Sequence, residues 1–168
     1  MDWSWIGRHL DDIAASVAEH VLLTVIAVVG GLVIAFALTL VIRRARWTSP
    51  PITFLAGTLY TIPSLALFAL LVPITGFTLL TAEIGLIGYT LLILIRNLLA
   101  GLDGVPQDVT EAARGMGYTT GAMLWRVELP LALPVIIAGV RIATVTTIGL
   151  VTVTALIGQG GLGQQILL

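Results

Sequence analysis

Four long apolar runs dominate the chain, and short polar stretches separate them. The predicted boundaries of these runs are 21–42, 52–74, 82–99 and 131–157. The first run holds 22 residues without a charge, which gives about 33 Å of α-helix and is enough to cross the hydrocarbon core of a bilayer. Since a helix satisfies its backbone hydrogen bonds internally in lipid, the pattern predicts an all-α, polytopic membrane protein with about four spans in a single domain, 1–168.

Residues 1–20 differ from these runs because apolar and charged residues alternate there. An apolar face repeats at helical spacing, and its members are Ile6, Leu10, Ile13 and Val17. Trp3 and Trp5 suit the headgroup level of a membrane. We therefore predict an amino-terminal helix lying in the interface. The alternative is a short solvated segment leading into the first span.

The arginines predict the orientation of the chain in the membrane. Arg43, Arg44 and Arg46 follow the first span directly, whereas the amino terminus is acidic. Short loops rich in arginine stay in the cytoplasm. We therefore expect the amino terminus outside and residues 100–130 in the cytoplasm. Four crossings then leave a glycine-rich turn and a new apolar start outside, so we expect the chain to lack a last carboxyl-terminal span.

Residues 100–130, which we call the polar loop, contain the longest polar stretch between two spans. Asp108 and Glu111 have the spacing of a capping box and predict the start of a short helix. An apolar stripe with small residues at its centre follows, made of Val109, Ala112, Ala113 and Met116. Gly115 and Gly117 are expected to end this helix.

A second short helix is predicted after the glycines. Thr119 or Thr120 can cap it, and it is expected to stop before Pro130, because a proline disfavours helix at the residue before it. Two short helices joined by a glycine turn fit a cleft on another protein. The alternative from physics alone is a hairpin that packs on its own spans.

Three places inside the spans carry polar or helix-breaking residues. Pro63 lies in the middle of the second predicted span and is expected to kink its helix. Tyr60, Thr61 and Ser64 then either line a path for solute or belong to a kink that serves only packing. Arg141 lies about 15 Å into the fourth span. Because an arginine is costly in lipid, its side chain is expected to face other helices and to have a partner there. Structural ion pairing is the main hypothesis, and contact with solute is the alternative. Glu83 is expected to reach the interface, as are Arg96 and Asn97 at the other end of that span.

Composition excludes several function classes. The chain is 58% hydrophobic and 10% charged, with a mean hydropathy of +1.07, where about 25% charged is usual for a soluble domain. All eight cationic residues are arginine, so the chain lacks the lysine of a P-loop nucleotidase. It has no cysteine and two histidines, which argues against thiol chemistry and metal binding. A net charge of −1 gives no signal for nucleic acid, and no nucleophile stands with a base.

The carboxyl-terminal glycines match a dinucleotide-binding loop only in spacing. Gly158, Gly160 and Gly163 follow an apolar stretch, but such a fingerprint must open a helix inside a soluble βαβ unit. Few residues remain after them. We instead predict an external turn in which backbones approach closely.

The polar loop also resembles a known signature. Glu-Ala-Ala, a glycine, an aliphatic residue and Leu-Pro stand at the spacing of the cytoplasmic coupling loop of permease subunits in binding-protein-dependent ABC importers. The matching residues are Glu111, Ala112, Ala113, Gly117, Val127, Leu129 and Pro130. Val127 departs from the isoleucine that is commoner there. YTIPSLALFALLVPITG, ILIRNLLAGLDGVP and IGQGGLG resemble the osmoprotectant branch, which carries glycine betaine, choline, carnitine or proline betaine.

The resemblance implies a type I importer permease of the bacterial inner membrane that is not itself an enzyme. Its implied partners are a second permease copy, two ABC ATPase subunits that bind ATP and Mg²⁺, and an extracytoplasmic solute-binding protein, and the chain itself binds no cofactor. Glu111 and Arg114 would then make polar contacts with an ATPase groove, Ala112 and Ala113 would allow a close fit, and Gly117 would make the turn.

The solute path is predicted less specifically. A quaternary ammonium favours aromatic faces, and the candidates are Tyr60, Pro63, Ser64 and Tyr89. The alternative substrate class is an amino acid, as in a methionine-type importer. A secondary transporter is a further alternative, but it would want an internal repeat and carboxylates inside the membrane, and only Glu83 qualifies.

Overall fold

The computed structural model describes residues 9–167, which form a helical bundle without a strand in that range. The long helices are α2 (Leu10–Arg44), α5 (Leu79–Asp103) and α8 (Leu129–Thr154). The shorter elements are η1 (Arg46–Thr48), α3 (Ser49–Thr61), α4 (Ser64–Thr75), α6 (Gln107–Gly115), α7 (Thr120–Met123), the π-helical turn η2 (Leu124–Glu128), η3 (Ala155–Ile157) and α9 (Leu162–Leu167).

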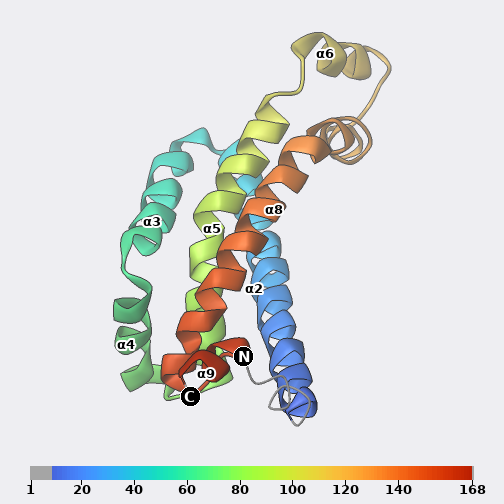
Figure 1. The fold of residues 1–168 in the computed structure, drawn as a ribbon. Helices are drawn as coiled ribbons and strands as arrows, with labels where there is room; N and C mark the ends of the chain where they lie inside the picture. Colours follow the sequence, from blue (N-terminus) through green and yellow to red (C-terminus); the bar gives the residue numbers. More distant parts are fainter. Residues whose placement is uncertain (1–8, 168) are drawn as a thin grey trace.

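The three long helices pack against one another, and α5 is the central one. α3 and α4 run along the side of α5, and α6 stands beyond the end where α2 and α5 finish and α8 begins, which we call the loop end (Figure 1). α9 lies at the opposite end. Three described helices are long and apolar enough to cross a membrane, and the count is four if the bent pair formed by α3 and α4 is one span.

The prediction of a separate interfacial helix is wrong for the part of it that the structure describes. Residues 10–20 are the first turns of α2, a single helix of 35 residues. No proline or glycine lies between Leu10 and Val29 to interrupt it, so the helix continues directly into the first span. Its length of about 52 Å exceeds the hydrocarbon thickness. The tryptophans at positions 3 and 5 lie outside the described residues.

The predicted second span is broken at Pro63 rather than kinked. α3 ends at Thr61, α4 begins at Ser64, and the two helices are bent by 100°. The residue before a proline is pushed out of helical geometry, and Ile62 is extended, with ψ at 129°. The Tyr89 hydroxyl of α5 donates a hydrogen bond to the Ile62 carbonyl oxygen. This bond satisfies an acceptor that the break leaves without a helical partner.

The carboxyl-terminal glycines form the close turn that the sequence predicts. Gly158 and Gly161 have positive φ angles of 74° and 45°. A Cβ atom on Gly163 would lie 2.5 Å from the carbonyl oxygen of Thr152, and one on Gly161 would meet the Ser16 backbone. Only glycine allows these approaches, so this turn seats α9 against α2 and α8.

Candidate functional site

The first helix of the polar loop begins two residues earlier than the capping-box prediction, which made Asp108 the N-cap. α6 starts at Gln107, and Pro106 occupies the position before it. The Thr110 backbone N–H donates to the Pro106 carbonyl oxygen at 3.3 Å, so the proline, with its fixed φ of −57°, sets the start of the helix. Asp108 makes no side-chain cap, and the capping-box prediction is therefore wrong.

Gly117 makes the turn that ends this helix, as predicted. Its φ is 85°, a left-handed conformation that side chains other than glycine rarely adopt. The backbone N–H of Tyr118 donates to the Ala113 carbonyl oxygen at 3.1 Å, and the backbone N–H of Gly117 donates to the Arg114 carbonyl oxygen at 2.9 Å. Gly115 is instead the last residue of α6 and has no positive φ. The direction in which the chain leaves α6 thus depends on Gly117.

The second helix of the polar loop is continuous with the last long helix. The Thr119 side chain caps it by accepting a hydrogen bond from the Ala122 N–H at 3.3 Å. α7 then passes through the π-helical turn η2 into α8, so the prediction that it stops before Pro130 is wrong. Pro130 sits in the first turn of α8, and the wider π turn just before it accommodates the missing N–H. α7, η2 and α8 therefore form one continuous helical segment.

The rest of the chain leaves most of the apolar stripe of α6 uncovered. Ala113 is buried, but Ala112 is exposed and Met116 is 70% exposed. Glu111 and Arg114 are also exposed. α6 packs mainly on α7 and η2, and it stands clear of the long helices (Figure 1). α6 does not lie back on the spans, so its exposed face remains free for a partner.

An ion-pair cluster fixes the base of the polar loop. The Arg43 guanidinium at the end of α2 donates to both Glu128 carboxylate oxygens of η2, at 2.6 and 2.9 Å. Arg46 pairs in the same forked manner with Asp103 at the end of α5, at 2.8 Å for each contact. Arg43 Nε also lies 4.0 Å from Asp103. The cluster therefore ties the ends of α2 and α5 to the turn that carries the loop into α8.

Sequence reasoning missed this cluster because it used the arginines only to orient the chain. A signal was available: Arg43, Arg46, Asp103 and Glu128 all lie next to span ends on the same predicted side of the membrane. An aromatic contact adds to the same junction. The rings of Phe36 in α2 and Trp125 in η2 are 5.8 Å apart.

The solute-path candidates gather at the break between α3 and α4. Tyr60 and Tyr89 meet edge to face with ring centroids 6.1 Å apart. Tyr89 is only 5% exposed and uses its hydroxyl on Ile62, whereas Tyr60 is 40% exposed. Pro63 and Ser64 form the break itself. The structure brings these four residues together, and Tyr60 is the one whose ring remains largely accessible.

Glu83 does not reach the surface as predicted. It is 7% exposed within α5, and neither carboxylate oxygen has a hydrogen-bond partner among residues 9–167. The reason is that α5 begins at Leu79, earlier than predicted, and packs on its neighbours over its whole length. Glu83 thus lies one full turn inside the helix on an inward face.

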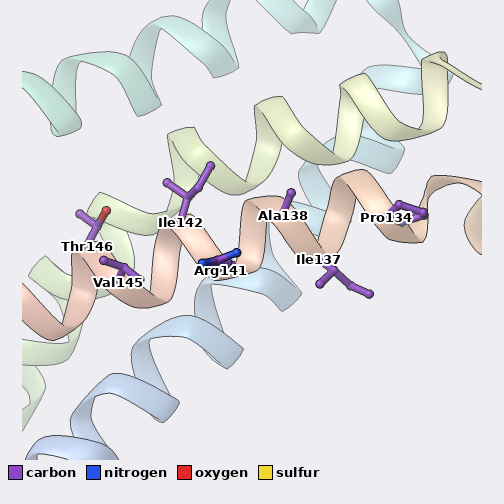
Figure 2. Close-up of a pocket in the computed structure, with 7 residues that line it drawn as sticks. All are labelled: Pro134, Ile137, Ala138, Arg141, Ile142, Val145 and Thr146. Atoms are coloured by element: carbon purple, nitrogen blue, oxygen red, sulfur yellow. The ribbon is translucent and has the colours of Figure 1, made fainter.

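Arg141 is not buried against other helices. It lies exposed near the middle of α8, and within the described part of the chain no carboxylate pairs with it. A groove of about 630 Å³ contains it, as Figure 2 shows. The groove is lined by Pro134, Ile137, Ala138, Arg141, Ile142, Val145 and Thr146. The predicted structural ion pair is therefore absent from the described residues.

The fold and the projecting polar loop define a class: a multi-pass helical membrane protein with a short exposed helix, α6, projecting at one end. The chain belongs to the family described as the binding-protein-dependent transport system inner membrane component, whose match covers residues 19–168. It is accordingly a multi-pass protein of the inner membrane.

Several relatives bear names from osmoprotectant transport. The osmoprotectant import permease protein OsmW of Salmonella typhimurium is 39% identical over 160 residues, which cover 92% of this chain and 74% of OsmW. The choline transport permease OpuBB of Bacillus subtilis is 37% identical over 148 residues, covering 88% of this chain and 68% of OpuBB. OpuCB of the same organism, a glycine betaine/carnitine/choline permease, is 35% identical with the same coverage.

A solved structure shares the fold. The inward-facing MetNI methionine ABC transporter contains a chain that matches with a TM-score of 0.76 at 22% identity, covering 98% of this chain and 81% of that one. At this identity the likeness establishes the architecture alone. The all-α permease fold predicted from the sequence is confirmed.

Proposed function

We propose that this chain is the transmembrane subunit of an ATP-driven importer of quaternary-ammonium osmoprotectants. The observation that carries the proposal is the exposed face of α6, held beyond the bundle and joined through α7 and η2 to α8 as a continuous helix. A docking face joined rigidly to a span is what a subunit driven by a partner needs. The family and the names of the relatives support the same function.

The proposed partners are those of an ABC importer permease. The family and the MetNI neighbour support ATPase and solute-binding partners, and we place ATP and Mg²⁺ on two separate ABC ATPase subunits, with no enzyme activity and no cofactor on this chain. A second copy or a close paralogue completes the solute path, and an extracytoplasmic solute-binding protein delivers the solute. The loop end faces the cytoplasm and the amino terminus faces outside, in agreement with the arginines at that end.

The mechanism is alternating access, driven through the polar loop. ATP binding draws the two ATPases together, and each carries one α6 in a surface groove. Glu111 and Arg114 make polar contacts there, Ala112 and Ala113 allow close approach, and Gly117 fixes the angle between α6 and α7. Val127, Leu129 and Pro130 lie where η2 passes into α8. Because the Arg43–Glu128 pair ties this junction to α2, the movement turns α2 and α8 together.

The solute assignment rests on the relatives. OpuBB transports choline by its name, and OpuCB glycine betaine, carnitine and choline. Tyr60 offers the exposed aromatic face that suits a quaternary ammonium. A methionine-type importer is the alternative, since MetNI shares the fold.

Reconstitution tests the proposal. The chain is assembled in proteoliposomes with the ATPase and solute-binding protein of its own importer, and uptake of radiolabelled glycine betaine, choline and methionine is measured. We expect uptake of a quaternary ammonium that requires ATP on the ATPase side. Uptake of methionine alone would transfer the assignment to the amino-acid class. Uptake that follows an ion gradient without ATP would instead support a secondary transporter, with Glu83 as its carboxylate.

A further inference from the structure

Arg141 occupies an unusual position among the described arginines. It has 12 residues of α8 before it and 13 after it within Leu129–Thr154, so about 18 Å of helix lies on either side. Arg43 and Arg46 are instead paired near the loop end. The Arg141 side chain is exposed in its groove and has no carboxylate partner among residues 9–167 (Figure 2).

Lipid is an unfavourable neighbour for this groove. An arginine at the centre of a membrane span costs several kcal/mol when hydrocarbon surrounds it, and such residues face a bundle interior or a water-filled cavity. The groove is otherwise apolar, apart from the Thr146 hydroxyl. Arg141 therefore belongs on a wetted or protein-covered face of the assembled importer.

The described residues of a second copy of this chain offer no carboxylate at the same depth. Glu83, which lies within α5, is buried on an inward face. The other described acidic residues lie towards the two ends of the bundle, and they are Asp11, Asp12, Glu19, Asp103, Asp108, Glu111 and Glu128. Among residues 9–167 of two such copies, Arg141 therefore has no carboxylate partner at its own depth.

We propose that Arg141 binds the carboxylate of the transported solute, so that the groove favours carboxylate-bearing quaternary ammonium compounds over choline. This inference rests on the proposed function. A guanidinium binds a carboxylate through two parallel hydrogen bonds, and Ile137, Ile142 and Val145 give the apolar walls that suit methylated ammonium groups. Glycine betaine and carnitine carry a carboxylate, and choline carries a hydroxyl in its place.

Uptake selectivity in the reconstituted importer tests the inference. We expect Arg141→Gln to lower glycine betaine uptake about tenfold or more, since it removes a charged hydrogen-bond donor, and to change choline uptake less than about twofold. Arg141→Lys should restore part of the glycine betaine uptake. Arg44→Gln, which removes an exposed arginine at the end of α2, is the control and should leave the ratio of the two uptakes unchanged. An equal fall for both solutes in Arg141→Gln, or no fall in either, overturns the inference.

Thiol labelling separates this inference from the proposed function. The chain has no cysteine, so Arg141→Cys introduces a single thiol into these 168 residues, and labelling is read on this chain alone. We expect a membrane-impermeant cationic thiol reagent to modify it, while Ala143→Cys, at a fully buried position of the same helix, should stay unmodified. No modification of Arg141→Cys overturns the inference. If the wild-type importer carries neither solute, the proposed function fails, and labelling still decides whether Arg141 faces water.

Discussion

Replacing Gly117 with valine is expected to lower ATP-driven uptake about tenfold or more while leaving the chain in the membrane. The φ angle of Gly117 is 85°, and no atom lies within 4 Å of the place where its Cβ would be. The effect therefore comes from the backbone and not from a clash. A left-handed conformation costs a residue with a side chain about 2 kcal/mol, and more for a β-branched one. The turn is then expected to relax and to misdirect α6.

Two matched variants control this result. Gly115→Val changes a site that also has no atom within 4 Å of a Cβ, but its φ is not positive, so near-normal uptake is expected. Gly117→Asn should retain more uptake than Gly117→Val, because asparagine tolerates the left-handed region. Uptake is measured against the amount of each variant in the membrane. Normal uptake by Gly117→Val would show that this turn plays no part in coupling.

Removing the carboxylate of Glu128 is expected to destabilise the protein by about 3 kcal/mol, the lower end of the range for breaking a buried ion pair. The Arg43 side chain is 24% exposed and that of Glu128 is 10% exposed. Glu128→Ala leaves the guanidinium of Arg43 without its forked partner, and Asp103 at 4.0 Å replaces only part of the attraction. Thermal unfolding in detergent and uptake should both show the loss.

The neighbouring pair gives the control for this prediction. Arg46 and Asp103 make the same forked contact, but the Arg46 side chain is 61% exposed. Arg46→Gln should therefore cost less than about 1 kcal/mol. Exchanging the charges, with Arg43→Glu and Glu128→Arg together, should recover part of the lost stability. If Glu128→Ala and Arg46→Gln prove equally mild, the cluster does not hold the loop to α2.

The features that the sequence predicted well depend on neighbouring residues. Long apolar runs specify membrane helices whatever their packing. Gly117 and the carboxyl-terminal glycines mark turns because few other residues adopt the same backbone. The start of the second loop helix at Thr119 was also readable from local capping rules. The apolar stripe of α6 followed from its own periodicity, and only Ala113 of it is buried.

The features that it did not predict depend on distant residues. The 100° bend at Pro63 needs α5, because Tyr89 satisfies the Ile62 carbonyl there. The Arg43–Glu128 pair joins residues 85 positions apart. Arg141 was expected to find a partner inside the chain, since nothing in a single sequence distinguishes a helix face that packs on its own spans from one that lines a shared path. Pro130 predicted a helix end, but the π-helical turn η2 just before it lets the helix continue into α8.

Cross-linking tests the central claim that α6 docks on an ATPase. Because the chain has no cysteine, Glu111→Cys on the exposed face of α6 carries the only thiol of the permease. Phe77→Cys, exposed between α4 and α5 at the opposite end, is the control. In inner membranes that hold the whole importer, a short thiol-reactive photo-cross-linker is expected to join Glu111→Cys to the ATPase subunit and to leave Phe77→Cys unjoined. A transport-competent Glu111→Cys importer that never cross-links to the ATPase would contradict the account.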